Sequence, residues 1–185
     1  MGQIMSSLFI TGNGFDIAHG IPTKYSEFRS FVLQKFPDAL KFRDDVVYLE
    51  DFENIGQDEF AAEILLNAMD KAAGKNWCNF EEALAYINFD NKFPLPNHKE
   101  NETDEEDQIL MKQYLLYMDM LTSVFIGCSK IWQDFFRLWL KEIQYVIDQG
   151  SYQPKDDLLK LFSDSEMQFF SFNYTKTLQK LYGVK

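Results

Sequence analysis

The sequence predicts an α/β fold that is predominantly helical, with a small parallel, Rossmann-like sheet and a large helical insertion. Short apolar runs followed by Gly- or Asn-containing turns lie near both ends of the 185-residue chain. The stretch between them has helical periodicity and no second apolar strand pattern. We therefore predict one domain over residues 1–185, a length that suits a single core.

The first strand-turn-helix unit is expected near residues 7–36. Leu8–Thr11 is a short apolar run that suits a buried parallel strand, and a Gly-Asn-Gly turn closes it. Thr23 could cap the helix that follows, and Pro37 ends it. This helix has one apolar face, formed by Tyr25, Phe28, Val32 and Phe36.

The helical block is expected over about residues 57–162. Its helices are Phe60–Ala73, Trp77–Ile87 and a long one from Ile109 to about Gln149, interrupted near Gly127. The acidic segment from His98 to Gln108 is typical of a solvated loop. With no cofactor motif nearby, we interpret the apolar stripe of the long helix as core: Trp132, Phe135, Phe136, Trp139, Ile143 and Val146.

The second unit is expected near residues 166–183. An apolar run, Met167–Phe172, leads into Asn173 and a final helix, Thr175–Tyr182. Parallel strands placed side by side would bring both turns to the carboxyl edge of the sheet, where ligands bind in open α/β folds. We therefore expect Asn13 and Asn173 at the ends of adjacent parallel strands, with their side chains opening into one pocket.

Composition excludes several classes of function. A net charge of −11 argues against broad nucleic-acid binding. Cys78 and Cys128 are too far apart in the sequence for a CxxC pair, so we predict free thiols in the cytoplasm. One usable histidine leaves too few ligands for a metal. No membrane association is expected, because the longest uncharged apolar stretch is far short of a span and no secretory leader is present.

The Gly12-Asn13-Gly14 turn predicts a phosphate site, because glycines let backbone amides approach an anion closely. Its spacing departs from the dinucleotide fingerprint, which would need a third glycine where Ile17 stands. The alternative is a turn with a left-handed backbone conformation, which needs glycine whether or not a ligand binds. Spacing alone leaves both open.

Asp16 and His19 follow the turn and would share a face if that segment is helical. One interpretation places both Asp16 and His19 in a functional site. The other makes Asp16 a helix N-cap and His19 a neutral imidazole hydrogen-bonded to a nearby carbonyl. His98, in the acidic segment, is expected to be solvated.

Three segments together carry a resemblance: "LFITGNGFDIAHGIPTKYSEF", "WCNFEEAL" and "FFSFNYTKTLQKLY". In this order they resemble the bacterial AbiH family of phage abortive-infection proteins. That family is in turn distantly similar to the sirtuin-like NAD-binding fold. There a Gly-rich loop after the first strand holds the dinucleotide, and an Asn-containing motif after a later strand lies beside the nicotinamide ribose.

The resemblance implies a role for each matching residue. The phosphate-side loop would be formed by Gly12, Asn13, Gly14 and Phe15. Asn173 would be the ribose-side asparagine and a catalytic residue. Asp16 and His19 belong to the abortive-infection motif, with conjectural catalytic roles. Glu81 either faces the same cleft or is a solvated helix carboxylate.

Two departures bear on the activity. Thr175 stands where the sirtuin-like pattern has aspartate, and no histidine follows His98, so only His19 could be the general base. Because AbiH relatives usually run longer, we expect this chain to be an amino-terminal part or a short form. The leading hypothesis is phage defence through cleavage of the nicotinamide–ribose bond of NAD, or through a related nucleotide reaction.

The alternative is a non-catalytic module of an abortive-infection system that senses a ligand or binds a protein partner or phage-derived trigger. In that case the helical block would offer the partner surface, and a homo-oligomer is one form it could take. A nuclease-type toxin is a third reading, in which Asp16 and Glu81 would begin a metal-binding carboxylate cluster.

Overall fold

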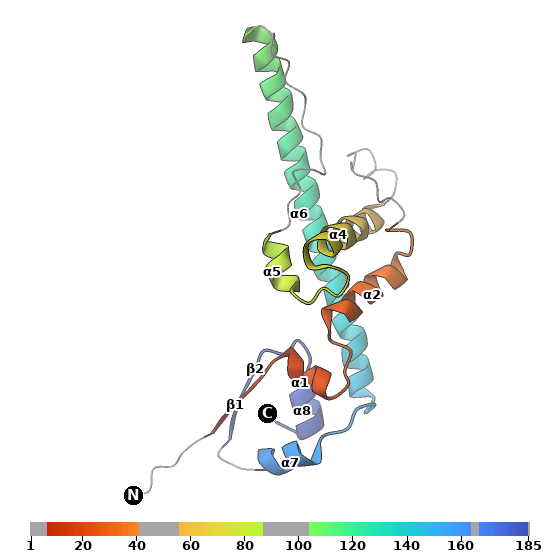
Figure 1. Ribbon diagram of the computed structural model, residues 1–185, viewed down its shortest axis with the longest axis vertical. Helices are drawn as coiled ribbons and strands as arrows, with labels where there is room; N and C mark the ends of the chain where they lie inside the picture. The colour runs from red at the N-terminus through yellow and green to blue at the C-terminus, as the bar shows by residue number, and fades with distance from the viewer. Residues whose placement is uncertain (1–6, 41–55, 87–103, 164–166, 185) are drawn as a thin grey trace, which may run out of the picture. The chain divides into compact units, whose positions relative to one another are not determined.

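The computed structural model describes residues 7–40, 56–86, 104–163 and 167–184, and most of them are helical (Figure 1). The chain divides into two compact units. Met1–Phe28 with Phe136–Lys185 forms the first unit, and Arg29–Phe135 forms the second. The predicted excess of helix and the small parallel sheet are confirmed. That the chain folds as a single domain stays a prediction.

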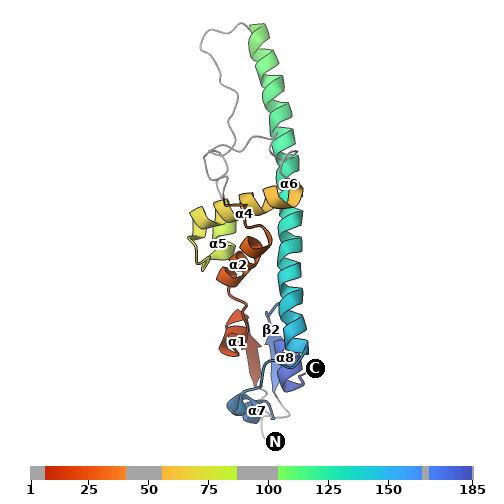
Figure 2. The same cartoon turned by 90° about the vertical axis from the view of Figure 1, so that its right-hand side faces the viewer.

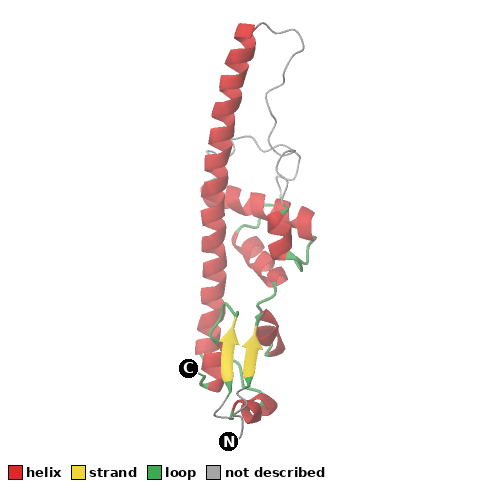
Figure 3. Ribbon diagram, turned by 90° about the vertical axis from the view of Figure 1, so that its left-hand side faces the viewer, coloured by secondary structure: helices red, strands yellow, loops and turns green. Residues whose placement is uncertain are grey.

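The sheet of the first unit joins the two ends of the chain. β1 (Leu8–Thr11) and β2 (Gln168–Ser171) run parallel and side by side (Figure 3), with Leu8 opposite Gln168 and Thr11 opposite Ser171. The ladder continues past the strands, since the Phe172 amide donates to the Thr11 carbonyl over 2.9 Å. Both turns therefore leave the sheet at one edge, as the sequence predicts.

One face of this sheet is covered by aromatic side chains. Phe9 and Phe169 lie with ring centroids 4.7 and 5.0 Å from that of Phe162. Phe162 ends α7 (Asp156–Phe162), and α1 (Asn13–Ala18) and α8 (Thr177–Tyr182) supply two further rings, Phe15 and Tyr182. These contacts make a small aromatic core.

The other face is open to solvent. Its side chains are between 54% and 66% exposed: Leu8, Ile10, Phe170 and Phe172. The prediction that β1 is a buried strand is therefore wrong for this face. Successive residues of a strand point to opposite sides, so only Phe9 and Thr11 turn toward the covered face.

The remaining helices are α2 (Tyr25–Lys35), α4 (Gln57–Ala73), α5 (Phe80–Ala85) and α6 (Asp104–Asp148), shown in Figure 2. α2 and α4 confirm the predicted helices to within about a turn. Thr23 does not cap α2, because its buried hydroxyl has no hydrogen-bond partner among the described residues. α5 begins later than predicted, because Trp77 lies in a left-handed conformation (φ 48°) that no helix can include.

α6 differs from the prediction in three ways. It begins at Asp104, inside the expected acidic loop, whose residues 98–103 lie outside the described ranges. It runs through Gly127 without the expected interruption, since a single glycine costs a helix only about 1 kcal/mol. In its apolar stripe Phe135, Trp139 and Ile143 are buried as predicted. Ile147, at 2% exposure, then takes the place expected for Val146.

The core of the second unit lies where α4 meets α6. Its buried residues are Phe60, Ala61, Ile64, Leu121, Val124 and Cys128. Trp132 adds a hydrogen bond from its indole nitrogen to the Ala61 carbonyl, over 2.7 Å. Burial raises the pKa of the Cys128 thiol to about 11, so this side chain stays neutral, whereas Cys78 is exposed.

By length and composition alone, Gln108–Asp148 of α6 could cross a membrane, and among the described segments it alone meets that criterion. Core helices of soluble proteins meet it as well. Leu121, Val124 and Cys128 pack against α4, whereas only 11% of the most apolar stretch of this helix is buried.

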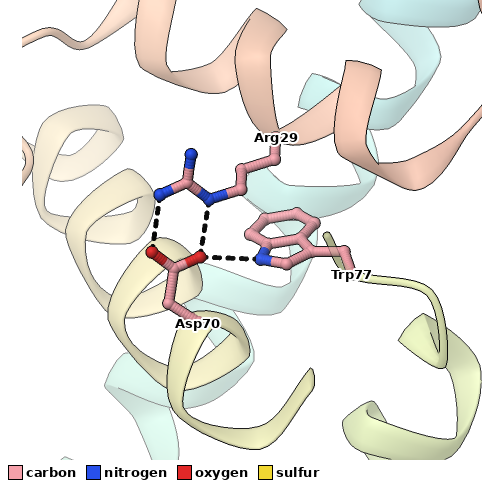
Figure 4. Close-up of polar contacts among 3 residues, drawn as sticks. All are labelled: Arg29, Asp70 and Trp77. Carbon is pink, nitrogen blue, oxygen red and sulfur yellow. Dashed lines mark hydrogen bonds and ion pairs between the residues drawn. The ribbon is translucent and has the colours of Figure 1, made fainter. Parts of the chain in front are cut away.

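A polar contact in the second unit joins α2, α4 and the turn before α5 (Figure 4). Arg29 donates from Nε and Nη2 to the two carboxylate oxygens of Asp70, each over 2.6 Å. The Trp77 indole donates to the same carboxylate over 2.8 Å and stacks on Phe80. The bond to Asp70 raises the pKa of Arg29, and both partners are largely buried, at 13% and 16% exposure.

We expect Asp70→Ala to lower the free energy of unfolding by about 2–4 kcal/mol, because it leaves a largely buried guanidinium unpaired. Trp77→Phe should cost about 1–3 kcal/mol, since it keeps a ring against Phe80 but loses the indole donor. Urea unfolding followed by circular dichroism measures both. Lys71→Ala, an exposed neighbour on α4, is the control, and an Asp70→Ala protein as stable as this control would contradict the expectation.

Candidate functional site

Asp16 lies at the centre of a buried polar cluster at the carboxyl end of β1. It is 1% exposed, in α1, directly after the Gly12–Gly14 turn. Asn173 Nδ2 donates to its Oδ1 over 2.7 Å, and Thr175 Oγ1 donates to its Oδ2 over 2.6 Å. Asp16 is therefore not the N-cap of α1, a position that Gly12 occupies. Its carboxylate joins the two predicted turns.

The donors and acceptors of this cluster can be assigned. The Asp16 carboxylate can only accept hydrogen bonds, so the Thr175 hydroxyl donates its one proton to it. Thr177, whose hydroxyl lies 2.8 Å away, must then donate to Thr175 Oγ1. For the same reason Asn173 turns its nitrogen toward Asp16. Its Oδ1 is buried and has no partner among the described residues.

Asn13 has a different partner. Its side-chain nitrogen donates to the Thr23 carbonyl over 2.8 Å, which fixes the loop between α1 and α2. Asn13 and Asn173 thus follow adjacent parallel strands as expected. Each amide nitrogen is bonded within the first unit, and a pocket common to both side chains stays a prediction.

His19 is held through both ring nitrogens. Nδ1 lies 2.7 Å from the Phe15 carbonyl, which can only accept, so Nδ1 carries the proton. Nε2 lies 2.6 Å from the Tyr182 hydroxyl, and the Lys155 amide donates to that same hydroxyl oxygen over 2.9 Å. Burial raises the pKa of Tyr182. His19 could act as a general base only if Tyr182 left Nε2 free.

The two glycines of the turn are not required by its backbone. Gly12 is extended (φ −146°, ψ −168°), a conformation open to any residue, and Gly14 lies within α1. A Cβ on either glycine would meet no atom within 4 Å. The left-handed-turn alternative therefore does not apply to them. The amides of Asn13 and Gly14 begin α1 and so have no intrahelical acceptor.

The other predicted residues lie apart from this cluster. The Phe15 ring packs against His19 and Tyr182 in the aromatic core, at centroid distances of 4.5 and 5.8 Å. Glu81 is exposed on α5 in the second unit, so its place in the cleft stays a prediction. His98 lies outside the described residues. Within those residues, no three His, Cys, Asp or Glu side chains gather in a way that could hold a metal.

Sequence reasoning missed three members of the site: Thr177, Tyr182 and the Lys155 amide. Thr177 carried a weak signal, because it follows Asn173 and Thr175 at alternate positions of the last motif. Tyr182 ends the same motif, but nothing in the sequence indicated its bond to His19, which spans 163 residues.

We expect Thr175→Val to lower the free energy of unfolding by about 1–3 kcal/mol, because the buried Asp16 carboxylate loses one of its two donors. Thr175→Ser keeps the hydroxyl and removes one methyl group, so it should cost no more than about 1 kcal/mol. Thermal and urea unfolding of the two variants provide the comparison. Equal losses in both would show that packing, and not the hydrogen bond, matters at this position.

The comparison with known families agrees with the motifs. The family model for bacteriophage abortive infection AbiH matches residues 8–185, which include both strands and every residue of the Asp16 cluster. No protein of curated function and no solved structure shows significant similarity to the chain. The match covers nearly the whole sequence, and the chain belongs to the AbiH family of bacteriophage abortive-infection proteins.

Proposed function

We propose that this protein acts in phage defence from the cytoplasm, and that it binds NAD or a related nucleotide between the Gly12–Gly14 turn and Asn173. One observation carries the proposal. Gly12 and Gly14 stand at the carboxyl end of β1 where neither backbone conformation nor packing calls for glycine. The open space above them would let a phosphate approach the backbone closely, and a side chain would fill it.

The neighbouring strand supports the same ligand class. Asn173 follows β2 at the same edge of the sheet, and its Oδ1 is a buried acceptor without a partner in the described structure. A ribose hydroxyl is a donor that would meet this need. In open parallel α/β sheets, ligands bind beyond the carboxyl ends of the strands, where both of these turns lie. The turn amides would hold the phosphates, and Asn173 would orient the sugar.

The hydrogen bonds of the site favour binding over turnover by this chain. Cleavage of the nicotinamide–ribose bond needs a base within reach of a ribose hydroxyl. Asp16 already accepts two hydrogen bonds, and both nitrogens of His19 are engaged. The function supported best is therefore a nucleotide-binding module of an abortive-infection system, responding to a phage-derived trigger or protein partner. NAD-glycohydrolase-like activity is the second candidate, and it requires a base from elsewhere.

We expect Gly14→Val to weaken binding of NAD and ADP-ribose at least about tenfold, because a β-branched side chain blocks approach to the backbone. The fold should persist, with a melting temperature within about 3 °C of the wild type, since the new Cβ meets no neighbour. Isothermal titration calorimetry measures the binding.

Gly127→Val is the matched control for this variant. Gly127 also has open space around its Cβ position, but it lies on α6 in the second unit. The control should bind both ligands as the wild type does. Equal binding heats for the wild type and Gly14→Val would remove the basis of the proposed phosphate site.

We further expect the isolated chain to bind NAD but to release no nicotinamide above the uncatalysed rate, because Tyr182 occupies the one nitrogen of His19 that could take a proton. Chromatographic detection of nicotinamide tests this. Robust release that disappears in both His19→Ala and His19→Gln would identify His19 as the base. The glutamine variant can retain hydrogen bonds to its neighbours, so it separates loss of the base from loss of the fold.

A further inference from the structure

The amino-terminal half of α6 carries an apolar surface that no other described element covers. Six large side chains within twelve residues are between 38% and 70% exposed: Ile109, Met111, Leu115, Leu116, Met118 and Met120. Only 11% of the most apolar stretch of this helix is buried. In Figure 2 this part of α6 extends past α4 with no other described helix beside it. Ile109, Leu116 and Met120 share one side of the helix, and the other three lie on the opposite side. Exposed apolar surface on one side of a helix points to an interaction site.

Part of this surface forms one stripe, which we call the α6 stripe. Its members recur at the three- and four-residue spacing of a single helix face: Ile109, Lys112, Leu116, Asp119 and Met120. Leu121, which packs against α4, lies on another face of the helix, and Val124, four residues after Met120, lies at the edge of the stripe. Lys112 and Asp119 are exposed, and neither has an ion-pair partner within the described part of the chain.

We propose that the α6 stripe binds the same stripe of a second copy of this chain, with the two helices antiparallel. The charges of Lys112 and Asp119 favour a second copy of the chain as the binding partner. A two-fold axis crossing the helix between Leu115 and Leu116 places Lys112 level with the partner's Asp119, and Asp119 level with the partner's Lys112. The stripe is therefore complementary to itself, as a two-fold interface requires.

The same charges disfavour the other arrangements. A parallel pair would set Lys112 against Lys112 and Asp119 against Asp119, which repel. Insertion into lipid would remove both charges from water without giving either a partner. In the antiparallel pair the apolar residues supply the affinity. The exposed Lys–Asp pairs contribute little energy but fix the direction and register of the helices.

Charge reversal tests the proposal by analytical ultracentrifugation of the full chain over a range of concentrations. The wild type should dimerise, and Leu116→Glu should be monomeric. Lys112→Glu and Asp119→Lys should each raise the dimer dissociation constant about tenfold or more, because each places like charges together. The double variant Lys112→Glu/Asp119→Lys should recover most of the wild-type affinity, since it only exchanges the two signs.

Lys130→Glu is the matched control. It makes the same charge change on the same helix, beyond the part that the partner helix would overlap, so dimerisation should be unaltered. A wild type that stays monomeric, or a dimer insensitive to Leu116→Glu, overturns the proposal. So does a double variant as weak as the single ones. A monomer that sediments with phosphatidylglycerol vesicles, and loses this in Leu116→Glu, would assign the stripe to a membrane instead.

Discussion

The hydrogen bonds that Asn173 and Thr175 donate to Asp16 join segments 157 and 159 residues apart, and the first unit depends on them. Two strands of four residues cannot hold two distant chain segments together alone, since a two-stranded sheet is marginal in water and closing a long loop costs entropy. The buried carboxylate adds two charge-assisted bonds at the edge where these strands end. The same contact thus stabilises the sheet and builds the candidate site.

This contact also fixes the orientation of the Asn173 amide. A carboxylate can only accept, so Asn173 must turn its nitrogen inward and leave Oδ1 as the free acceptor. The Gly12–Phe15 turn is held from its other side, where His19 donates to the Phe15 carbonyl and Tyr182 secures the imidazole. His19 thus holds the Phe15 carbonyl, and Asp16 holds the Asn173 amide. Pre-organisation of this kind is what a binding site needs.

Structural elements that depend on neighbouring residues could be predicted from the sequence. Contacts between residues far apart in the chain could not. Both strands and α4 follow from short apolar runs, helical periodicity and glycine stops, and these depend on neighbours in the chain. The same reasoning fails at Trp77, because an aromatic residue rarely adopts a left-handed conformation. Here Trp77 adopts it while its indole bonds to Asp70 and stacks on Phe80. At the candidate site, the first and last sequence motifs indicated Asp16 and Asn173 as site residues. Their mutual bond and the role of Tyr182 are tertiary contacts without a sequence pattern.

A threonine at position 175 has a physical reason in this cluster. An aspartate there would bring a second carboxylate to within hydrogen-bond distance of Asp16, and two buried like charges cannot both stay ionised cheaply. Threonine supplies a donor instead, so the carboxylate of the site comes from the first motif and not from the last. In the proposed nucleotide site, phosphates would be repelled from Asp16 and favoured at the amides of Asn13 and Gly14, and the neutral, hydroxyl-bearing sugar would lie beside Asn173.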